Sequence, residues 1–122
     1  MKFALPLVAT AAAVLVLTGC ATGGKPSMAI EEIMESGFKG KESLCARLTQ
    51  GQTSQEENLR MVQLTRELSL NKPPKGDLAS WTAKTTALHA AAQDVAARKP
   101  GAVDAFKSAV NCKACHSVHK PD

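Results

Sequence analysis

Aromatic side chains are scarce in this 122-residue sequence, which has one Trp, three Phe and no Tyr. A small domain with so few large side chains builds only a thin hydrophobic core. Strict alternation of apolar and polar residues is also missing, which argues against β-strands, and the sequence has no internal repeat. The Lys and Arg residues form no cluster and the formal net charge is +4, so the composition gives no support to nucleic-acid binding.

The first 19 residues predict a signal peptide. Lys2 precedes the apolar stretch 3–17, which is shorter than the ~20 residues of a membrane-spanning helix. The sequence Leu-Thr-Gly-Cys at 17–20 resembles the bacterial lipoprotein signal, in which cleavage precedes the Cys and the Cys is acylated. We therefore expect an exported chain that is lipid-anchored through Cys20 on the periplasmic side. Ala21 stands where an Asp would indicate the inner membrane, which favours the outer membrane; an ordinary signal peptide cleaved elsewhere is the alternative.

Residues 20–27 predict a flexible tether, and residues 28–122 predict one all-α domain. Apolar residues recur there at the three- and four-residue spacing of amphipathic helices. The four periodic sets are Ile30, Ile33, Met34 and Phe38; Met61, Leu64 and Leu68; Leu78, Trp81, Thr85, Leu88, Ala92 and Val95; and Val103, Phe106 and Val110.

Breaks between these sets are marked by residues that end or begin helices. Gly37 and Gly40 interrupt the first set, after which a helix is expected over 42–50. Ser54 and Glu57 have the spacing of a capping box. The connector 72–76 contains two prolines, and Asp77 is the expected N-cap of the third helix. The last helix is expected from about residue 102 to beyond 116, which gives an antiparallel four-helix bundle in up-down-up-down order.

Near the C-terminus, the segment Cys112-Lys113-Ala114-Cys115-His116 has the C-x-x-C-H spacing of c-type haem attachment. Two thiols three residues apart lie on one edge of a helix and can join the two vinyl groups of one porphyrin. His116 follows directly and can bind the iron as the proximal ligand. The motif therefore predicts one haem c per chain, bound covalently through two thioethers.

Three other interpretations of this cluster fit the sequence less well. Cys112, Cys115, His116 and His119 are all zinc-ligand types, but four ligands within eight residues of one helix cannot surround a metal ion. A thioredoxin-like pair needs a βαβ context and a helix N-terminus, whereas this pair is expected near a helix C-terminus. A disulfide between Cys112 and Cys115 leaves His116 unexplained. The fourth cysteine of the chain, Cys45, lies in an apolar run and is expected to be a small buried side chain.

The segments 81–84, 90–92 and 111–116 together resemble the class II c-type cytochromes, the cytochrome c′ family. The resemblance covers about residues 28–120, and the first half matches only in its periodicity. It implies a four-helix bundle with covalent haem on the last helix. The family usually has an aromatic residue and then Arg after the haem His, whereas this chain has His119 and Lys120. Lys120 could still lie near a haem propionate.

Two functions are compatible with the resemblance, and the sixth iron ligand separates them. One branch of the family uses a Met of the first helix and carries electrons; Met34 is our candidate, with flexible core packing as the alternative. The other branch leaves the iron five-coordinate and binds nitric oxide or carbon monoxide. His89 is expected at the edge of the bundle, and His119 is expected near a propionate or exposed. Met28 and Met61 are expected to pack.

The sequence shows no distal acid/base pair that would support a haem enzyme. We therefore expect an electron carrier with periplasmic or membrane redox partners and without nucleic-acid binding. A homodimer is compatible with the family resemblance. A lipoprotein without haem, in which the C-x-x-C-H spacing is incidental, is the remaining alternative.

Overall fold

The computed structural model describes residues 24–121, which form six helices and no strand. The helices are α1 (Ile30–Gly37), α2 (Leu44–Thr49), α3 (Gln55–Leu70), α4 (Leu78–Ala96), α5 (Ala102–Ala109) and α6 (Cys112–His119). The all-α prediction is therefore confirmed for this part of the chain. None of these helices has both the length and the apolarity needed to cross a membrane. The predicted signal peptide 1–19 and Cys20 lie outside the described residues.

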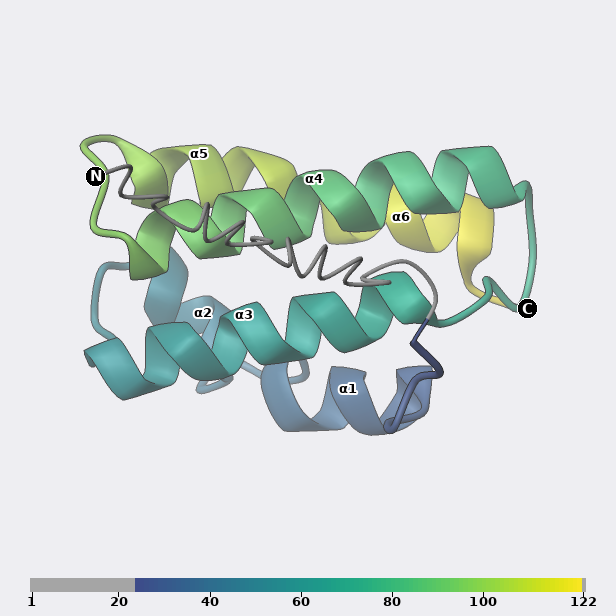
Figure 1. The fold of residues 1–122 in the computed structure, drawn as a ribbon, viewed down its shortest axis with the longest axis horizontal. Coiled ribbons are helices and arrows are strands. Elements are labelled where there is room, and N and C mark those ends of the chain that lie inside the picture. The colour runs from purple at the N-terminus through teal and green to yellow at the C-terminus, as the bar shows by residue number, and fades with distance from the viewer. Residues whose placement is uncertain (1–23, 122) are drawn as a thin grey trace, which may run out of the picture.

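Helices α3 and α4 lie side by side and antiparallel in the middle of the molecule (Figure 1). Helices α1 and α2 follow one another along α3, while α5 and α6 follow one another along α4. Contacts between α2 and α5 close the side away from the α3–α4 pair. The C-terminal end and the start of the described chain consequently lie at the same end of the molecule.

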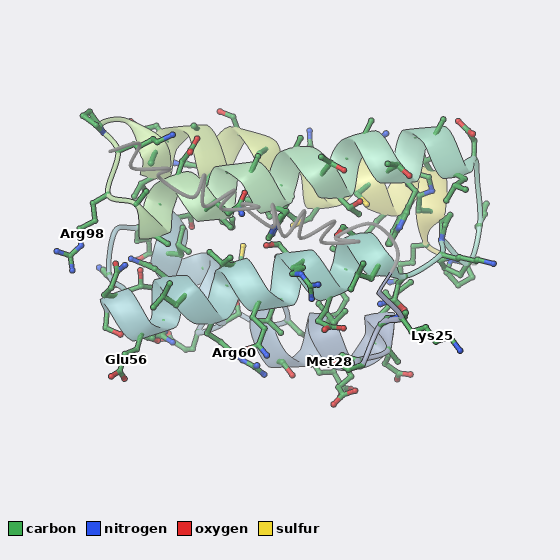
Figure 2. The ribbon with its side chains drawn as sticks, in the orientation of Figure 1. Lys25, Met28, Glu56, Arg60 and Arg98 are labelled. Atoms are coloured by element: carbon green, nitrogen blue, oxygen red, sulfur yellow. The ribbon has the colours of Figure 1, made fainter. Side chains whose placement is uncertain are left out.

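The hydrophobic core lies between these helices and uses the residues that the periodicity selects. Met61 and Leu64 of α3, Ile33 of α1 and Phe106 of α5 are fully buried. The expected packing of Met61 and Met28 is confirmed, since Met28 is partly buried against the core. Charged side chains of α3, such as Glu56 and Arg60, point outward (Figure 2). Leu78 differs from the prediction, because it is 58% exposed as the first residue of α4.

Several predicted helix boundaries agree with the structure. Ser54 and Glu57 form both hydrogen bonds of the capping box at the start of α3. Asp77 caps α4 by accepting hydrogen bonds from the backbone N–H groups of Ala79 and Ser80. The predicted helix over 42–50 is shorter than expected, because Ser43 caps α2 and the helix begins at Leu44.

The prediction of one continuous last helix was wrong, because the chain bends between α5 and α6. Val110 has φ −80° and ψ 65°, and Asn111 has φ −89° and ψ 84°. These angles belong to inverse γ-turns, and the backbone N–H groups of Asn111 and Cys112 donate to carbonyls two residues earlier. The Asn111 side chain then caps α6 by accepting from the Ala114 N–H at 3.0 Å. The cysteine pair consequently lies on a separate short helix.

The start of α1 is tied to α3 by one carboxylate. Glu67 accepts hydrogen bonds from the Ser27 N–H at 2.8 Å, the Ser27 hydroxyl at 2.9 Å and the Met28 N–H at 3.3 Å. Asn71 donates to the Met28 carbonyl at 2.9 Å. Farther along, Gly37 lets α1 approach α3 closely, since a Cβ atom there would lie 2.6 Å from a methyl carbon of Leu64. These contacts position the face of α1 that carries Met34.

Candidate cofactor-binding site

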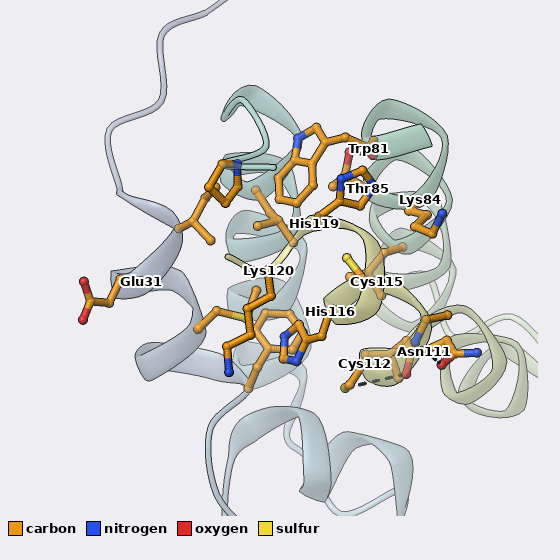
Figure 3. A pocket seen from close by; sticks show the side chains of 18 of the residues that line it. Glu31, Trp81, Lys84, Thr85, Asn111, Cys112, Cys115, His116, His119 and Lys120 are labelled. Atoms are coloured by element: carbon orange, nitrogen blue, oxygen red, sulfur yellow. Dashed lines mark hydrogen bonds between the residues drawn. The ribbon is translucent and has the colours of Figure 1, made fainter. Parts of the chain in front are cut away.

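A cavity of about 750 Å³ lies between α1, α4 and α6. Its size falls within the roughly 300–1,000 Å³ of small-molecule and cofactor pockets. Most of its wall is apolar, and a few polar and charged side chains stand at its border (Figure 3). The apolar part includes Ile30, Met34, Phe38, Leu68, Trp81, Leu88 and Val110. The cavity therefore has the character of a site for a large, mostly apolar ligand.

The C-x-x-C-H motif forms the α6 side of this cavity, where Cys112, Cys115 and His116 all lie in the wall. Cys112 is the first residue of α6 and is exposed, while Cys115 is half-buried. Both thiols are free. The His116 side chain is exposed. The motif thus presents two thiols and an imidazole to a single cavity.

Cys112 begins α6, so the cysteine pair lies at a helix N-terminus and not near a helix C-terminus as expected. The described residues nevertheless lack the strands of a βαβ unit. The pKa of the Cys115 thiol is raised by burial; the nearby Lys84 ammonium opposes that rise and the Cys112 thiolate adds to it. Burial therefore keeps the Cys115 thiol protonated at neutral pH, and the lack of strands among residues 24–121 is what argues against a thioredoxin-like pair.

Across the cavity, α1 and its C-cap residue Phe38 contribute three apolar side chains to the wall. Met34 is partly buried and lies in the same cavity as His116. Ile30 and Phe38 lie in this wall as well, also partly buried. His116, the predicted proximal iron ligand, and Met34, the candidate sixth ligand, therefore line one cavity. The cavity wall also surrounds Met34 with apolar groups that could shield an open iron site.

His89 does not line the cavity. Its Nδ1 atom forms a hydrogen bond of 3.1 Å with the hydroxyl of Thr65 on α3. The pKa of His89 is lowered, chiefly by burial. His89 therefore belongs to the contact between α3 and α4, and the expected edge position fits better than a ligand role.

His119 is buried, which corrects the expectation that its side chain is exposed. The side chain is 2% exposed and lies in the cavity wall beside Trp81 (Figure 3). Its ring nitrogens are within hydrogen-bond distance of the Lys75 carbonyl and the Ser80 hydroxyl. Because these partners come from the connector before α4 and from α4 itself, the helical pattern of α6 could not reveal them.

Three lysines border the cavity, and two of them were not expected there. Lys120 was considered near a propionate, whereas Lys39 and Lys84 were not assigned to the site. Lys84 donates a hydrogen bond of 2.7 Å to the Ser80 hydroxyl. Lys84 is the one Lys or Arg residue of α4. A single such residue in an otherwise uncharged stretch is the feature of the sequence that could have indicated a role in the site. Such cations suit a ligand that carries carboxylates.

Cys45 is buried, as expected, with 7% of its surface exposed. Burial raises the pKa of the Cys45 thiol to about 11, with a smaller contribution from the Cys112 thiolate. This thiol therefore stays protonated at neutral pH and behaves as a small apolar group. Within residues 24–121, no group of three or more His, Cys, Asp or Glu side chains is arranged to hold a metal ion.

Searches of family models, of curated proteins and of solved structures returned no match for the chain. The residues that line the cavity and the motif in its wall are therefore the features that indicate a function.

Proposed function

We propose that the chain is a mono-haem c-type cytochrome that transfers electrons and is not an enzyme. The proposal depends above all on one observation: the two thiols of the motif, His116 and Met34 all line a single, mostly apolar cavity. A haem bound there would supply an iron that alternates between the ferric and ferrous states. Such a group would also fill the space that the scarce aromatic residues leave in the core.

The residues of the cavity fit this cofactor by their chemistry. Cys112 and Cys115 would hold the porphyrin as thioethers, and His116 would bind the iron from the α6 side. Met34 is the candidate sixth ligand from α1. Lys39, Lys84 and Lys120 line the cavity and would supply cations for the two propionates. The apolar wall would exclude water from the iron and keep the rearrangement that accompanies electron transfer small.

The wider assignment extends the same proposal. We infer that the six helices form a four-helix bundle of the cytochrome c′ type, in which α1 with α2 and α5 with α6 are two interrupted members. The signal in residues 1–19 and Cys20 support an exported lipoprotein on the periplasmic side. Its partners would then be redox proteins of the periplasm or membrane.

A gas-binding haem protein is the second candidate, because Ile30 and Phe38 stand beside Met34 in the wall. If these apolar groups cover an open iron, nitric oxide or carbon monoxide could bind there. The position of Met34 in the same cavity favours the electron carrier, since a thioether ligand would occupy the binding position.

The deciding experiment is an absorption spectrum of chain produced together with the c-type cytochrome maturation machinery. We expect pigment that survives denaturation, with low-spin bands that carbon monoxide leaves unchanged. The Cys112→Ser/Cys115→Ser variant should lose the covalent pigment, whereas Cys45→Ser should keep it. A large shift with carbon monoxide would support the gas-binding function. Colourless protein with both motif thiols reactive would refute the haem proposal.

A further inference from the structure

Helix α6 has few attachments to the rest of the described chain. It spans only eight residues, and the two bends at Val110 and Asn111 separate it from α5. Among the described helices, α4 is the one that α6 approaches closely. The motif helix therefore depends on contacts near its C-terminal end for a fixed position.

His119 supplies such a contact through both nitrogens of its ring. Nδ1 lies 2.9 Å from the Lys75 carbonyl oxygen, which can only accept, so Nδ1 carries the proton. Nε2 then accepts from the Ser80 hydroxyl at 3.2 Å. That hydroxyl in turn accepts from the Lys84 ammonium at 2.7 Å. The ring is thus fixed in one tautomer and one orientation, as hydrogen bonds to both nitrogens require.

The residues around the His119 ring leave a closely fitting space for it. The His119 ring meets Trp81 edge-on, with centroids 5.4 Å apart and an interplanar angle of 78°. The Trp81 indole N–H donates to the Asn71 carbonyl at 2.8 Å, which holds the indole in place. Gly76 adopts a φ of +83°, and a Cβ atom there would lie 2.7 Å from the Val118 carbonyl oxygen. A side chain at position 76 would therefore push α6 away.

We propose that His119 is a positioning residue: its buried ring fixes α6 against α4 and thereby sets where Cys115 and His116 stand in the cavity. His116 and His119 are three residues apart on one helix, so a displacement of His119 moves the imidazole of His116 with it. The consequence for iron ligation rests on the proposed function, whereas the fixing of α6 does not.

The first test uses the chain without cofactor and measures the reactivity of its thiols. His119→Phe keeps a ring of similar shape and removes both hydrogen bonds. We expect the rate of Cys115 modification to rise at least about fivefold relative to that of Cys112, since each lost hydrogen bond lowers the cost of opening α6. Cys112 is already exposed and Cys45 is buried, so these two thiols serve as internal references. Trp81, the one Trp of the chain, should change its fluorescence emission as its neighbour leaves.

Two further variants keep the test decisive if His119→Phe folds poorly. Ser80→Ala removes only the partner of Nε2 and should raise the Cys115 rate by a smaller factor. Gly76→Ala perturbs α6 directly at Val118 and His119 and should act in the same direction. Gly40→Ala is its matched control, because Gly40 also has a positive φ, +98°, and has open space around it. His89→Phe is the control for the loss of a hydrogen-bonded histidine outside the cavity.

The second test uses the pigmented chain. We expect His119→Phe to shift the absorption bands and the reduction potential, while His89→Phe leaves both unchanged. An unchanged Cys115 rate and Trp81 emission in folded His119→Phe would overturn the proposal. A faster Cys115 with an unchanged spectrum would refute the effect on His116. If the wild-type chain forms no pigment, the proposed function fails, and the thiol rates still decide whether His119 fixes α6.

Discussion

His116 lies on α6 directly after Cys115 and belongs to the wall of the cavity. If it is the proximal ligand, His116→Ala should leave the covalent pigment reduced or absent, with iron that is poorly ligated. The measurement is the absorption spectrum and the amount of covalent haem per chain. His89→Ala is the matched control, since His89 bonds Thr65 away from the cavity. A normal spectrum in His116→Ala would contradict the assignment.

Met34 allows a sharper distinction, because ligand binding and packing predict different results. As a ligand, Met34→Ala should convert low-spin iron to high-spin iron and open it to carbon monoxide. As packing alone, it should change only the free energy of unfolding. Met34 is partly exposed, so we expect that loss to stay below the about 2–5 kcal/mol found for buried Met→Ala. Spectra with and without carbon monoxide, together with denaturant unfolding, measure both effects.

For single residues, the sequence predicts a role where that role depends on neighbours along the chain. The spacing of Cys112, Cys115 and His116 is such a local pattern. The burial of Cys45 follows from its apolar run in the same way. The position of His119 is different, because Lys75 and Ser80 lie about 40 positions earlier in the sequence. A pattern within α6 carries no information on such partners.

At the scale of elements, the contact between Glu67 and the segment before α1 predicts a pH effect. The pKa of the Glu67 carboxyl is lowered, chiefly by the hydrogen bond from the Ser27 N–H. The stabilisation is therefore complete above the ordinary Glu pKa of about 4.3. It is lost as the pH falls through the lower pKa of the folded chain.

We accordingly expect Glu67→Gln to lower the free energy of unfolding by about 1–3 kcal/mol at pH 7, as for hydrogen bonds to a charged group. The difference from the wild-type chain should shrink as the pH approaches 3. Denaturant unfolding across this pH range measures it. Glu56→Gln, an exposed change on the same helix, should leave stability within about 0.5 kcal/mol. A loss for Glu67→Gln that does not depend on pH would contradict the ionised carboxylate as its source.

Helix boundaries with strong local signals were predictable, whereas the break in the last helix was not. Ser54 with Glu57, and Asp77 after two prolines, satisfy exposed backbone groups within a few residues, so the sequence alone identifies them. Neither Val110 nor Asn111 is Gly or Pro, and the apolar spacing continues across them. The one local signal is Asn111, a preferred N-cap residue whose side chain accepts from the Ala114 N–H. The continuing apolar spacing concealed that signal.

At the scale of the whole molecule, the small hydrophobic core and the cavity are connected. The buried core uses mostly aliphatic side chains, and its large aromatic residues are Trp81 and Phe106. Some of the core side chains, such as Leu68, Trp81 and Leu88, also line the cavity, where a ligand could contact them. A chain that lacks its cofactor would therefore leave this wall in contact with water. Stability and cofactor binding should be coupled.

We expect the pigmented chain to unfold at a higher temperature and a higher denaturant concentration than the same chain produced without the maturation machinery. Covering the apolar wall of the cavity is worth on the order of 5 kcal/mol at the usual value per unit of buried area. Circular dichroism of both forms, with the thiols of the colourless form kept reduced, measures the difference without any substitution. Equal midpoints would mean that the cavity is already closed by its own walls, and that the scarcity of aromatic residues has no connection with a bound porphyrin.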